Sequence, residues 1–332
     1  MLSGKSNQTN INFYRTAESV SPKHPDKLCD QISDAILDAC LEQDPDSRVA
    51  AETCGGHGIV FVTGEITSKA KDIDIASIVH RIAGDNLEVH TKIVKQSPEI
   101  AHGVDTGGAG DQGIMLGYAT DETPELLPKE VVLARDLNRT IYNIYPYDGK
   151  TQVTIAPDGT LSSIVASFQN ATSAELDEIV HSFIAEHHLK GSPELHLNPA
   201  GDWHQGGFDA DTGLTGRKLI VDNYGPRIPI GGGAFSGKDP SKVDRSAAYM
   251  ARKIAVDYLK KRHAHEVLVR LAYALGYAEP LEQPVIIDGT PEKITGYDLT
   301  PQGIITYLDL KRPIYEETAR YGHFGHAFPW DA

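Results

Sequence analysis

The sequence predicts an α+β fold of three similar units, in which strands alternate with amphipathic helices. The chain has 332 residues, more than one domain usually contains, so two or three domains are expected. Strand-like segments are followed by amphipathic helices, and this order recurs along the chain. Glycine-rich stretches at 107–110 and 201–207 are candidate boundaries. The expected domains are therefore 12–106, 107–204 and 205–332.

A helix over residues 27–42 is the first regular element that the sequence predicts. Its apolar residues recur at three- and four-residue spacing, and Pro25 suits the first helical position. The tripeptide Asp-Pro-Asp at 44–46 ends this pattern. Residues 59–66 follow and are typical of a buried β-strand.

The middle of the chain predicts a hairpin followed by a helix. Residues 151–156 and 161–168 are strand-like, and the Pro-Asp-Gly turn at 157–159 separates them. Thr172 and Glu175 have the spacing of a capping box. Apolar residues at helical spacing come directly after it, so a helix is expected to begin there.

A similar order returns in the last third of the chain. Residues 218–222 are strand-like, a glycine-rich turn follows, and an amphipathic helix is expected from about residue 240 to residue 261. The sequence therefore supports a third unit of the same kind.

Composition excludes several classes of protein. A formal net charge of −15 argues against nucleic acid or an anionic membrane surface as the main partner. Cys29, Cys40 and Cys54 form neither a C-x-x-C pair nor a plausible disulfide framework, which fits a reducing compartment. The first ten residues are polar, and no apolar run approaches the length of a membrane span. A cytoplasmic location is expected.

The stretch GGGAFSGKDPSK at 231–242 predicts a phosphate cradle. Asp239 could cap the following helix and Pro240 could occupy its first position, which leaves free N–H groups beside Lys238 and Lys242. The spacing also matches a Walker A loop up to Asp239, where that motif requires Ser or Thr to hold magnesium. A glycine turn capped by solvated lysines is the structural alternative.

Three further short motifs carry groups that could bind phosphate or metal. The sequence HPDK at 24–27 places a histidine, a carboxylate and an ammonium group at a helix start. GAGDQG at 108–113 is a tight turn with one acid and one amide, and GLTGRK at 213–218 ends in two cations. Each has an ordinary structural explanation: a helix start, a turn, and solvated surface cations.

Taken together and in order, these motifs resemble the S-adenosylmethionine synthetase (methionine adenosyltransferase) family over nearly the whole chain. The glycine-rich nonapeptide at 231–239 combined with GAGDQG is a very specific pair. The resemblance rests on the segments 18–20, 24–27, 29–45, 64–67, 95–98, 108–113, 213–218, 231–249 and 321–325.

The resemblance implies a fold, an assembly and a reaction. The fold would be three similar α/β two-layer domains in a pseudo-threefold arrangement. The assembly would be a homodimer with active sites at the subunit interface, or a dimer of dimers. ATP, L-methionine and water would give S-adenosylmethionine, phosphate and diphosphate. Two Mg²⁺ ions per site and K⁺ are the implied cofactors, and neither nucleic acid nor a membrane is an expected partner.

The resemblance also implies residue roles at matching positions. The catalytic residues would be His24, Lys150, Arg217 and Lys238. ATP would contact these four together with Asp111, Asp148, Ser167, Trp203, Asp211, Lys218 and Ala234. Methionine would contact Glu65, Gln96, Asp211 and Lys242, while Asp26 and Asp244 would bind magnesium and Glu52 would bind potassium.

The chemistry explains such an inventory. A thioether has no proton to lose, so its attack on C5′ needs no general base. Triphosphate leaves with several negative charges, and preorganised cations and metal ions would stabilise them. The segment 96–107 is the expected lid that excludes water.

Three departures from the family pattern bear on selectivity and on the lid. The chain is short for the family, including the segment 104–110. Asp202-Trp203 stands where Arg-Phe is usual, and Ile230 stands where a polar residue is common. We hypothesise that Trp203 stacks on the nucleobase and that base selectivity is looser than usual. A P-loop-like NTPase or kinase, and a non-catalytic member of the family that only binds a partner, are the competing functions.

Overall fold

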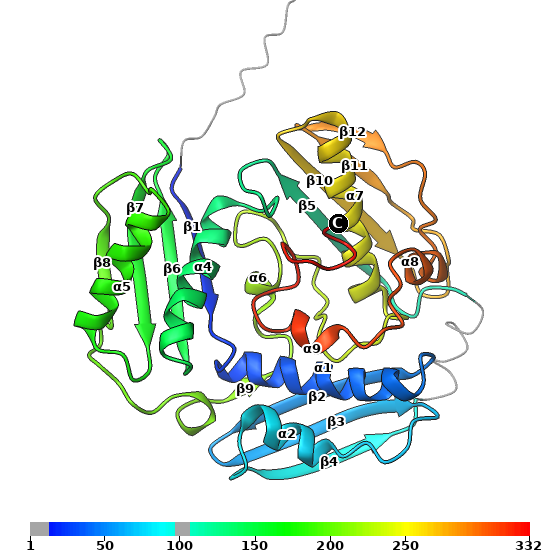
Figure 1. Cartoon of the computed structure of the whole chain (residues 1–332). Helices are drawn as coiled ribbons and strands as arrows, with labels where there is room; N and C mark the ends of the chain where they lie inside the picture. Colours follow the sequence, from blue (N-terminus) through cyan, green and yellow to red (C-terminus); the bar gives the residue numbers. More distant parts are fainter. Residues whose placement is uncertain (1–12, 97–106) are drawn as a thin grey trace, which may run out of the picture.

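The computed structural model describes residues 13–96 and 107–332 and contains three four-stranded sheets (Figure 1). The first sheet has the strand order β4 (Glu88–Val94), β3 (Ile59–Thr67), β2 (Arg48–Gly56) and β9 (Gly213–Leu214). The second has the order β1 (Arg15–Val20), β6 (Gly149–Ile155), β7 (Leu161–Phe168) and β8 (Glu194–Leu197). The third has the order β12 (Thr290–Lys293), β11 (Pro284–Ile287), β10 (Glu266–Tyr273) and β5 (Gly113–Thr120).

A long helix packs on each sheet. α1 (Pro25–Gln43) packs against β2, α4 (Lys129–Ile144) against β1 and β6, and α7 (Val243–Arg262) against β5 and β10. The remaining helices are α2 (Ile75–Ala83), α5 (Ser173–Glu186), α6 (Leu219–Asp222), α8 (Pro301–Tyr307), α9 (Tyr315–Thr318) and the 3₁₀ turn Gly207–Asp209. In the described part of the chain, no helix is both long enough and apolar enough to cross a membrane.

The three units share a chain order. In each, the long helix is followed directly by an antiparallel hairpin: β2–β3, β6–β7 or β10–β11. In the first two units a helix then leads to a fourth strand that pairs in parallel, as β3 pairs with β4 and β7 with β8. This repetition confirms the predicted mixture of helices and small sheets.

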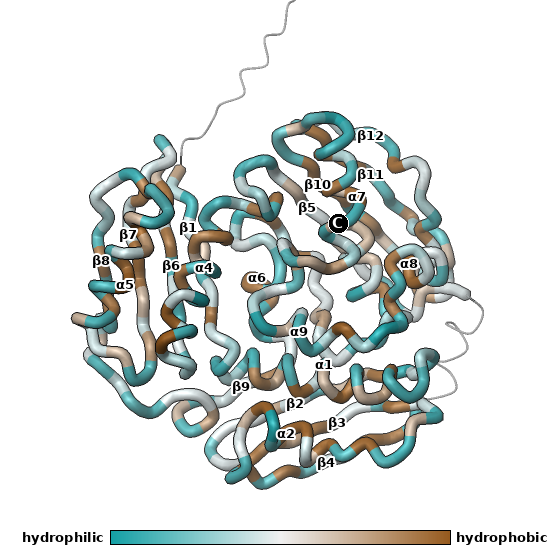
Figure 2. The backbone as a smooth tube through the Cα atoms, in the orientation of Figure 1, coloured by the Kyte–Doolittle hydropathy of each residue, from teal (hydrophilic) through white to brown (hydrophobic). Residues whose placement is uncertain are grey.

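Each sheet also recruits a strand from a distant part of the chain. β9 pairs with β2, β1 pairs with β6, and β5 pairs with β10. The units are therefore connected by backbone hydrogen bonds as well as by packing. One core cluster joins residues under the first and third sheets, and a second cluster lies under the second sheet. Figure 2 shows hydrophobic stretches concentrated in the strands and the helices packed on them.

The face of the first sheet that points away from α1 is open. Along β3, Val60 and Val62 are buried, whereas Phe61 is 49% exposed. The predicted strand at 59–66 is confirmed, but its burial is corrected, because the described residues cover only one face of this sheet. Ile114 on β5 and Leu214 on β9 are also exposed apolar residues.

Several local predictions are confirmed and two are corrected. α1 begins at Pro25 with His24 as its N-cap, and Thr172 and Glu175 form both bonds of a capping box. Residues 219–222 form the short helix α6 rather than a strand, since the Asp222 N–H donates to the Lys218 carbonyl (2.8 Å) and tertiary packing overrides β-propensity. The last long helix begins at Val243, not near residue 240.

Candidate active site

The start of α1 brings a histidine and a carboxylate together. The N-cap position gives His24 an extended backbone, and its Nδ1 accepts a hydrogen bond from the Asp26 N–H (3.2 Å). Both side chains are buried, His24 being 8% exposed and Asp26 3% exposed. Because Nδ1 is an acceptor, the neutral ring carries its proton on Nε2 and can donate from that atom.

The segment between β9 and α6 delivers two cations to Asp26. Lys218 forms an ion pair with Asp26 Oδ2, and the Arg217 Nε lies 3.8 Å from Oδ1. The Leu214 N–H donates to the same Oδ1 (3.0 Å). A Cβ at Gly213 would lie 2.2 Å from the Pro25 carbonyl oxygen, so glycine is required for this close approach.

The electrostatics of this corner hold His24 neutral and Asp26 ionised. Burial lowers the pKa of His24 to about 4, and the nearby ammonium groups of Lys218 and Lys150 add to this effect. Burial opposes ionisation of Asp26, but hydrogen bonds from Lys218 and Leu214 outweigh it and lower its pKa. The histidine therefore acts as a neutral hydrogen-bond donor in the ligand-free chain.

The beginning of β6 adds another cation on the same side. Lys150 pairs with Val20 across the β1–β6 ladder, and its Nζ lies 3.6 Å from Glu18 Oε2. Its partner on β7 is Ser167. The Lys150 side chain is 49% exposed, so it is available to a ligand.

Two carboxylates complete this corner. Asp148, just before β6, accepts a hydrogen bond from the Gly207 N–H (2.9 Å), and burial raises its pKa. Asp211 is exposed and close enough to His24 and Asp148 to influence the pKa of each. We call the following residues the α1 group: His24, Asp26, Asp148, Lys150, Asp211, Arg217 and Lys218.

The glycine-rich segment 231–242 is anchored to the edge of β2. The Ala51 N–H donates to the Gly237 carbonyl (2.9 Å), and the Val49 N–H donates to Asp239 Oδ2 (2.7 Å). An isolated antiparallel β-bridge also pairs Lys238 with Ala50. Asp239 thus fixes the loop to the sheet, and the N-cap of α7 is Lys242, which corrects the predicted capping role of Asp239.

The lysines of this loop are paired with carboxylates. The Lys238 Nζ donates to Asp244 Oδ2 (2.7 Å), and the Lys242 Nζ donates to Asp239. A Cβ at Gly233 would lie 2.1 Å from Asp244 Oδ1, so this glycine keeps space open at the carboxylate. Ala234 lies against Gly216, which brings the loop beside the segment that carries Arg217 and Lys218.

Other predicted residues lie around the same loop. Glu65 and Lys238 flank Ala50 on opposite sides of β2, and Glu52 is exposed two residues further along that strand. Asp111 is exposed in the turn before β5, and a Cβ at Gly113 would lie 3.5 Å from Asp244 Oδ1. We call the following residues the glycine-loop group: Glu52, Glu65, Asp111, Ala234, Lys238, Lys242 and Asp244.

Gln96 and the expected lid stand apart from these groups. The Gln96 N–H donates to Thr67 Oγ1 (3.2 Å), which places it at the end of β3. The predicted lid over 96–107 otherwise lies almost entirely outside the described residues. Among the described residues, no ion pair joins the α1 group to the glycine-loop group.

Trp203 is half-buried with its ring beside Gly206, and its neighbour Asp202 has a clear structural role. Asp202 Oδ1 accepts hydrogen bonds from the Ser173 N–H (2.9 Å) and hydroxyl (2.8 Å) at the first turn of α5. The Trp203 Nε1 is buried without a hydrogen-bond partner among the described residues. Asp202 therefore stabilises a helix start, which explains a carboxylate at this position.

A row of four aspartates on α1, not anticipated from the sequence, supports both groups. Asp26, Asp30, Asp34 and Asp38 recur at four-residue spacing on one helix face. Asp30 accepts from the Gly216 N–H (2.8 Å), Asp34 from the Gly237 N–H (2.8 Å), and Asp38 from the Glu316 N–H (2.8 Å). In the sequence, the four-residue spacing of these aspartates is the signal that could have revealed the row.

Two carboxylates, those of Asp26 and Asp244, are the candidate ligands for a metal ion. In 13–96 and 107–332, no cluster of three or more His, Cys, Asp or Glu side chains is arranged around a common point for a metal. Asp26 and Asp244 each offer one carboxylate, and Gly233 leaves space beside the second. Mg²⁺ is commonly held by one or two carboxylates together with substrate phosphates and water, so these residues fit that ion. Glu52 offers one exposed carboxylate as a donor.

The loop does not have the context of a P-loop. A P-loop connects a strand directly to a helix, whereas residues 223–242 follow the short helix α6 and contain no strand. Asp239 stands at the position of the Walker hydroxyl, and its carboxylate accepts hydrogen bonds from the Val49 N–H and the Lys242 Nζ. These features argue against the kinase-like alternative.

Comparison with known proteins supplies independent evidence. Family models described as the N-terminal, central and C-terminal domains of S-adenosylmethionine synthetase match residues 12–86, 106–203 and 205–332. The S-adenosylmethionine synthases of two strains of Thermus thermophilus are each 44% identical to the chain, with 95% of both sequences covered. That of Treponema denticola is 43% identical, covering 98% of this chain and 96% of the relative. Matches in the expected order over nearly the full length show that the chain belongs to the S-adenosylmethionine synthetase family.

Proposed function

We propose that the chain forms S-adenosylmethionine by direct attack of the methionine sulfur on C5′ of ATP, and then hydrolyses the triphosphate to diphosphate and phosphate. The chain is a methionine adenosyltransferase by its family membership. The observation that carries the mechanism is the convergence of His24, Arg217 and Lys218 at the start of α1, on a buried, ionised Asp26.

The departing triphosphate is the group that needs stabilisation. Arg217, Lys218 and Lys150 would face its negative charges, and Lys238 would approach from the glycine-rich loop. His24 would donate its Nε2–H to the oxygen that leaves C5′, which requires no prior protonation. The lysines are held by carboxylates in the ligand-free chain, so little reorganisation is needed when phosphate oxygens replace those partners.

Substrate recognition is assigned to residues of both groups. We assign the adenosine and phosphates of ATP to Asp111, Asp148, Ser167, Trp203, Asp211 and Ala234 in addition to the cations. Methionine is assigned to Glu65, Gln96, Asp211 and Lys242. The exposure of Glu65 and Asp211 supports these roles, because both carboxylates are free to meet the methionine ammonium group.

Cations would supplement the protein charges. We propose that Asp26 and Asp244 hold two Mg²⁺ ions and that Glu52 contributes to a K⁺ site. When bound, these ions would neutralise phosphate charge. Asp26 and Asp244 supply the carboxylates, which form ion pairs with Lys218 and Lys238 in the ligand-free chain.

We further propose that two copies of the chain build each active site. Phe61, Ile114 and Leu214 are exposed on sheet strands and provide apolar area for a homodimer interface. A homodimer would place the α1 group of one copy against the glycine-loop group of the other. A pseudo-threefold arrangement of domains 12–106, 107–204 and 205–332, pairing of dimers and a cytoplasmic location belong to the same proposal.

Product analysis tests the proposed reaction. The chain is incubated with ATP, L-methionine, Mg²⁺ and K⁺, and products are identified by mass spectrometry. S-adenosylmethionine, diphosphate and phosphate in equal amounts are expected. Formation of ADP, or of no methionine-dependent product, would reject the assignment.

A further inference from the structure

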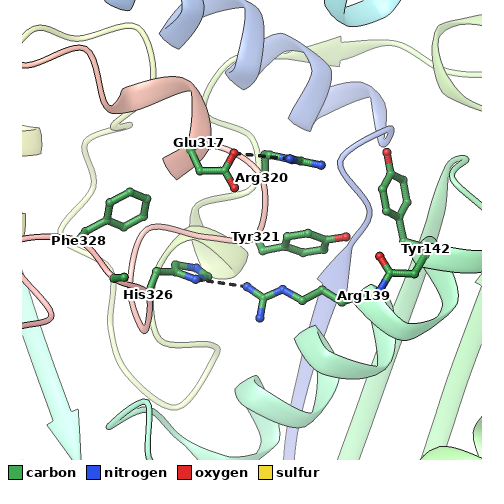
Figure 3. A pocket seen from close by; sticks show the side chains of 9 residues that line it. Arg139, Tyr142, Glu317, Arg320, Tyr321, His326 and Phe328 are labelled. Carbon is green, nitrogen blue, oxygen red and sulfur yellow. Dashed lines mark hydrogen bonds and ion pairs between the residues drawn. The ribbon is translucent and has the colours of Figure 1, made fainter.

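A second cavity lies away from the proposed active site, between α4 and the chain that follows α9. It has a volume of about 480 Å³. Arg139 and Tyr142 on α4 line one side, and Glu317, Arg320, Tyr321 and His326 line the other (Figure 3). None of these residues belongs to the α1 group or the glycine-loop group.

The cavity carries an excess of positive charge. Its lining contains two guanidinium groups and one carboxylate, in a chain whose net charge is −15. Arg320 lies 3.5 Å from Glu317, whose side chain is 69% exposed, so this ion pair is weak. The Arg320 Nε is buried and has no hydrogen-bond partner among the described residues.

The neighbouring groups neutralise this charge only in part, through the Arg139–Asp136 and Arg320–Glu317 ion pairs. Arg139 reaches Asp136 at 3.4 Å and His326 Nδ1 at 3.3 Å. Burial and the neighbouring arginines lower the pKa of His326 to about 3, so the imidazole is neutral at physiological pH. Arg135, which is fully buried behind the cavity, donates to backbone carbonyls and adds another positive charge.

Aromatic rings form the other part of the lining. The Arg139 guanidinium lies over the Tyr321 ring, 4.8 Å from its centroid. Figure 3 shows Tyr321 between Arg139 and Arg320, with Tyr142 on one side and Phe328 on the other. A flat ring could pack against these side chains while an attached anion meets the arginines.

We propose that this cavity binds a small ligand in which an aromatic ring carries one carboxylate or phosphate group. The volume is within the range of small-molecule sites, and the lining combines apolar rings with a few convergent polar groups. A guanidinium group can bind a carboxylate or a phosphate through two parallel hydrogen bonds. A bound anion would therefore complete the neutralisation of the two arginines in the lining. Arg320, which lines the cavity and whose ion pair with Glu317 is long and exposed, is the primary anion contact.

Calorimetric titration of the full chain tests this site with defined probes. Phenyl phosphate and benzoate are the intact ligands; phenol and inorganic phosphate are the separated parts of the first, and phenol and acetate stand for those of the second. We expect at least one intact probe to bind more tightly than either of its parts. Tighter binding of phenyl phosphate would identify a phosphate ligand, and tighter binding of benzoate a carboxylate ligand. Failure of both intact probes to bind would overturn the proposal.

Substitutions distinguish probe binding in this cavity from probe binding in the active site. Arg320→Gln and Arg139→Gln should each weaken probe binding roughly 10-fold or more, as expected for a lost charge-assisted contact. Glu317→Gln should strengthen binding, because it removes a competing carboxylate. Arg262→Gln, which alters an exposed arginine outside the cavity, should leave probe binding unchanged.

The same series gives the contradicting result. Probe binding that is lost in Lys218→Met but unchanged in Arg320→Gln would show that the probe occupies the active site, and the proposal would fail. Thermal unfolding of each variant shows whether it is folded. Should Arg139→Gln unfold, Arg320→Gln and Glu317→Gln, at partly exposed side chains, still decide the question.

Discussion

Lys218 and Asp26 illustrate how a single contact prepares this site. The lysine holds a buried carboxylate in its ionised form, and the carboxylate keeps the ammonium group in place for a phosphate. We expect Lys218→Met to lower kcat about 100- to 1,000-fold, the usual effect of removing one preorganised stabiliser of developing charge. Steady-state assays of S-adenosylmethionine formation measure this, with Lys261→Met, at an exposed position near the end of α7, as the control. Equal rates in the two variants would remove Lys218 from the mechanism.

His24 gives a prediction about pH. Its pKa in the metal-free and ligand-free chain is lowered to about 4, so the ring stays neutral from pH 5 upward. Since the unfolded ring titrates near 6.5, stability contributed by His24 is complete above that pH and is lost as pH falls toward 4. NMR titration of labelled histidines, with His24→Asn for assignment, gives the value directly. A midpoint near 6.5 would show that the ring is not desolvated as described.

Trp203 bears on nucleotide selectivity. Its ring is half-buried beside Gly206, and its Nε1 has no partner among the described residues. We expect Trp203→Ala to raise the KM for ATP roughly 10-fold, from loss of a stacking contact worth about 1–3 kcal/mol. Assays with ATP, GTP and CTP compare the three bases. An unchanged KM for each nucleotide would reject stacking on Trp203.

At the scale of elements, α1 is the support on which the site is built. Its row of aspartates binds backbone N–H groups of three separate segments: Gly216, Gly237 and Glu316. Asp34 also forms a bidentate pair with Arg245 at 2.6 and 2.8 Å, and both side chains are fully buried. One helix face therefore fixes both loops that we propose to face the phosphates.

This arrangement predicts the cost of breaking the buried pair. Arg245→Met leaves Asp34 charged and buried, so the free energy of unfolding should fall by about 3–5 kcal/mol. Denaturant unfolding measures the change. Arg262→Met, which removes an exposed pair with Glu292, is the matched control and should cost at most about 1 kcal/mol. A loss for Arg245→Met no larger than for the control would contradict the anchoring role.

Elements with strong local signals were predictable, and those determined by tertiary contacts were not. The proline and histidine at the start of α1, the Pro-Asp-Gly turn and the capping box each specify their own geometry. Residues 219–222 include β-branched side chains but form the helix α6, in which Asp222 forms an ion pair with Lys27 (2.7 Å). Similarly, Asp239 was expected to cap α7, but it bonds to β2, a segment 190 residues away in the chain.

Across the whole molecule, pairing between distant segments limits what sequence can predict about the site. The motifs at 24–27, 213–218 and 231–242 were recognisable individually. Their contact depends on β9 pairing with β2 and on Asp34 binding Gly237, which no local pattern encodes. The row of aspartates was visible as a four-residue repeat, but only the fold reveals that its members bind backbone groups.

The absence of a direct link between the two groups defines the central claim about assembly. Although Ala234 lies against Gly216, no ion pair among the described residues joins a member of the α1 group to a member of the glycine-loop group. Each group is paired internally, and both lie near open, partly apolar strands. We therefore expect Lys218 of one copy to act together with Lys238 of the other.

Mixing two inactive variants tests this expectation most directly. Lys218→Met and Lys238→Met are each purified, unfolded, combined in equal amounts and refolded, and the rate of S-adenosylmethionine formation is measured. If each site takes one lysine from each copy, the mixed dimers contain one intact site, and activity should recover to about a quarter of the unaltered rate. Activity that stays at the level of the separate variants would show that both lysines serve one site within a single chain, and would contradict the account.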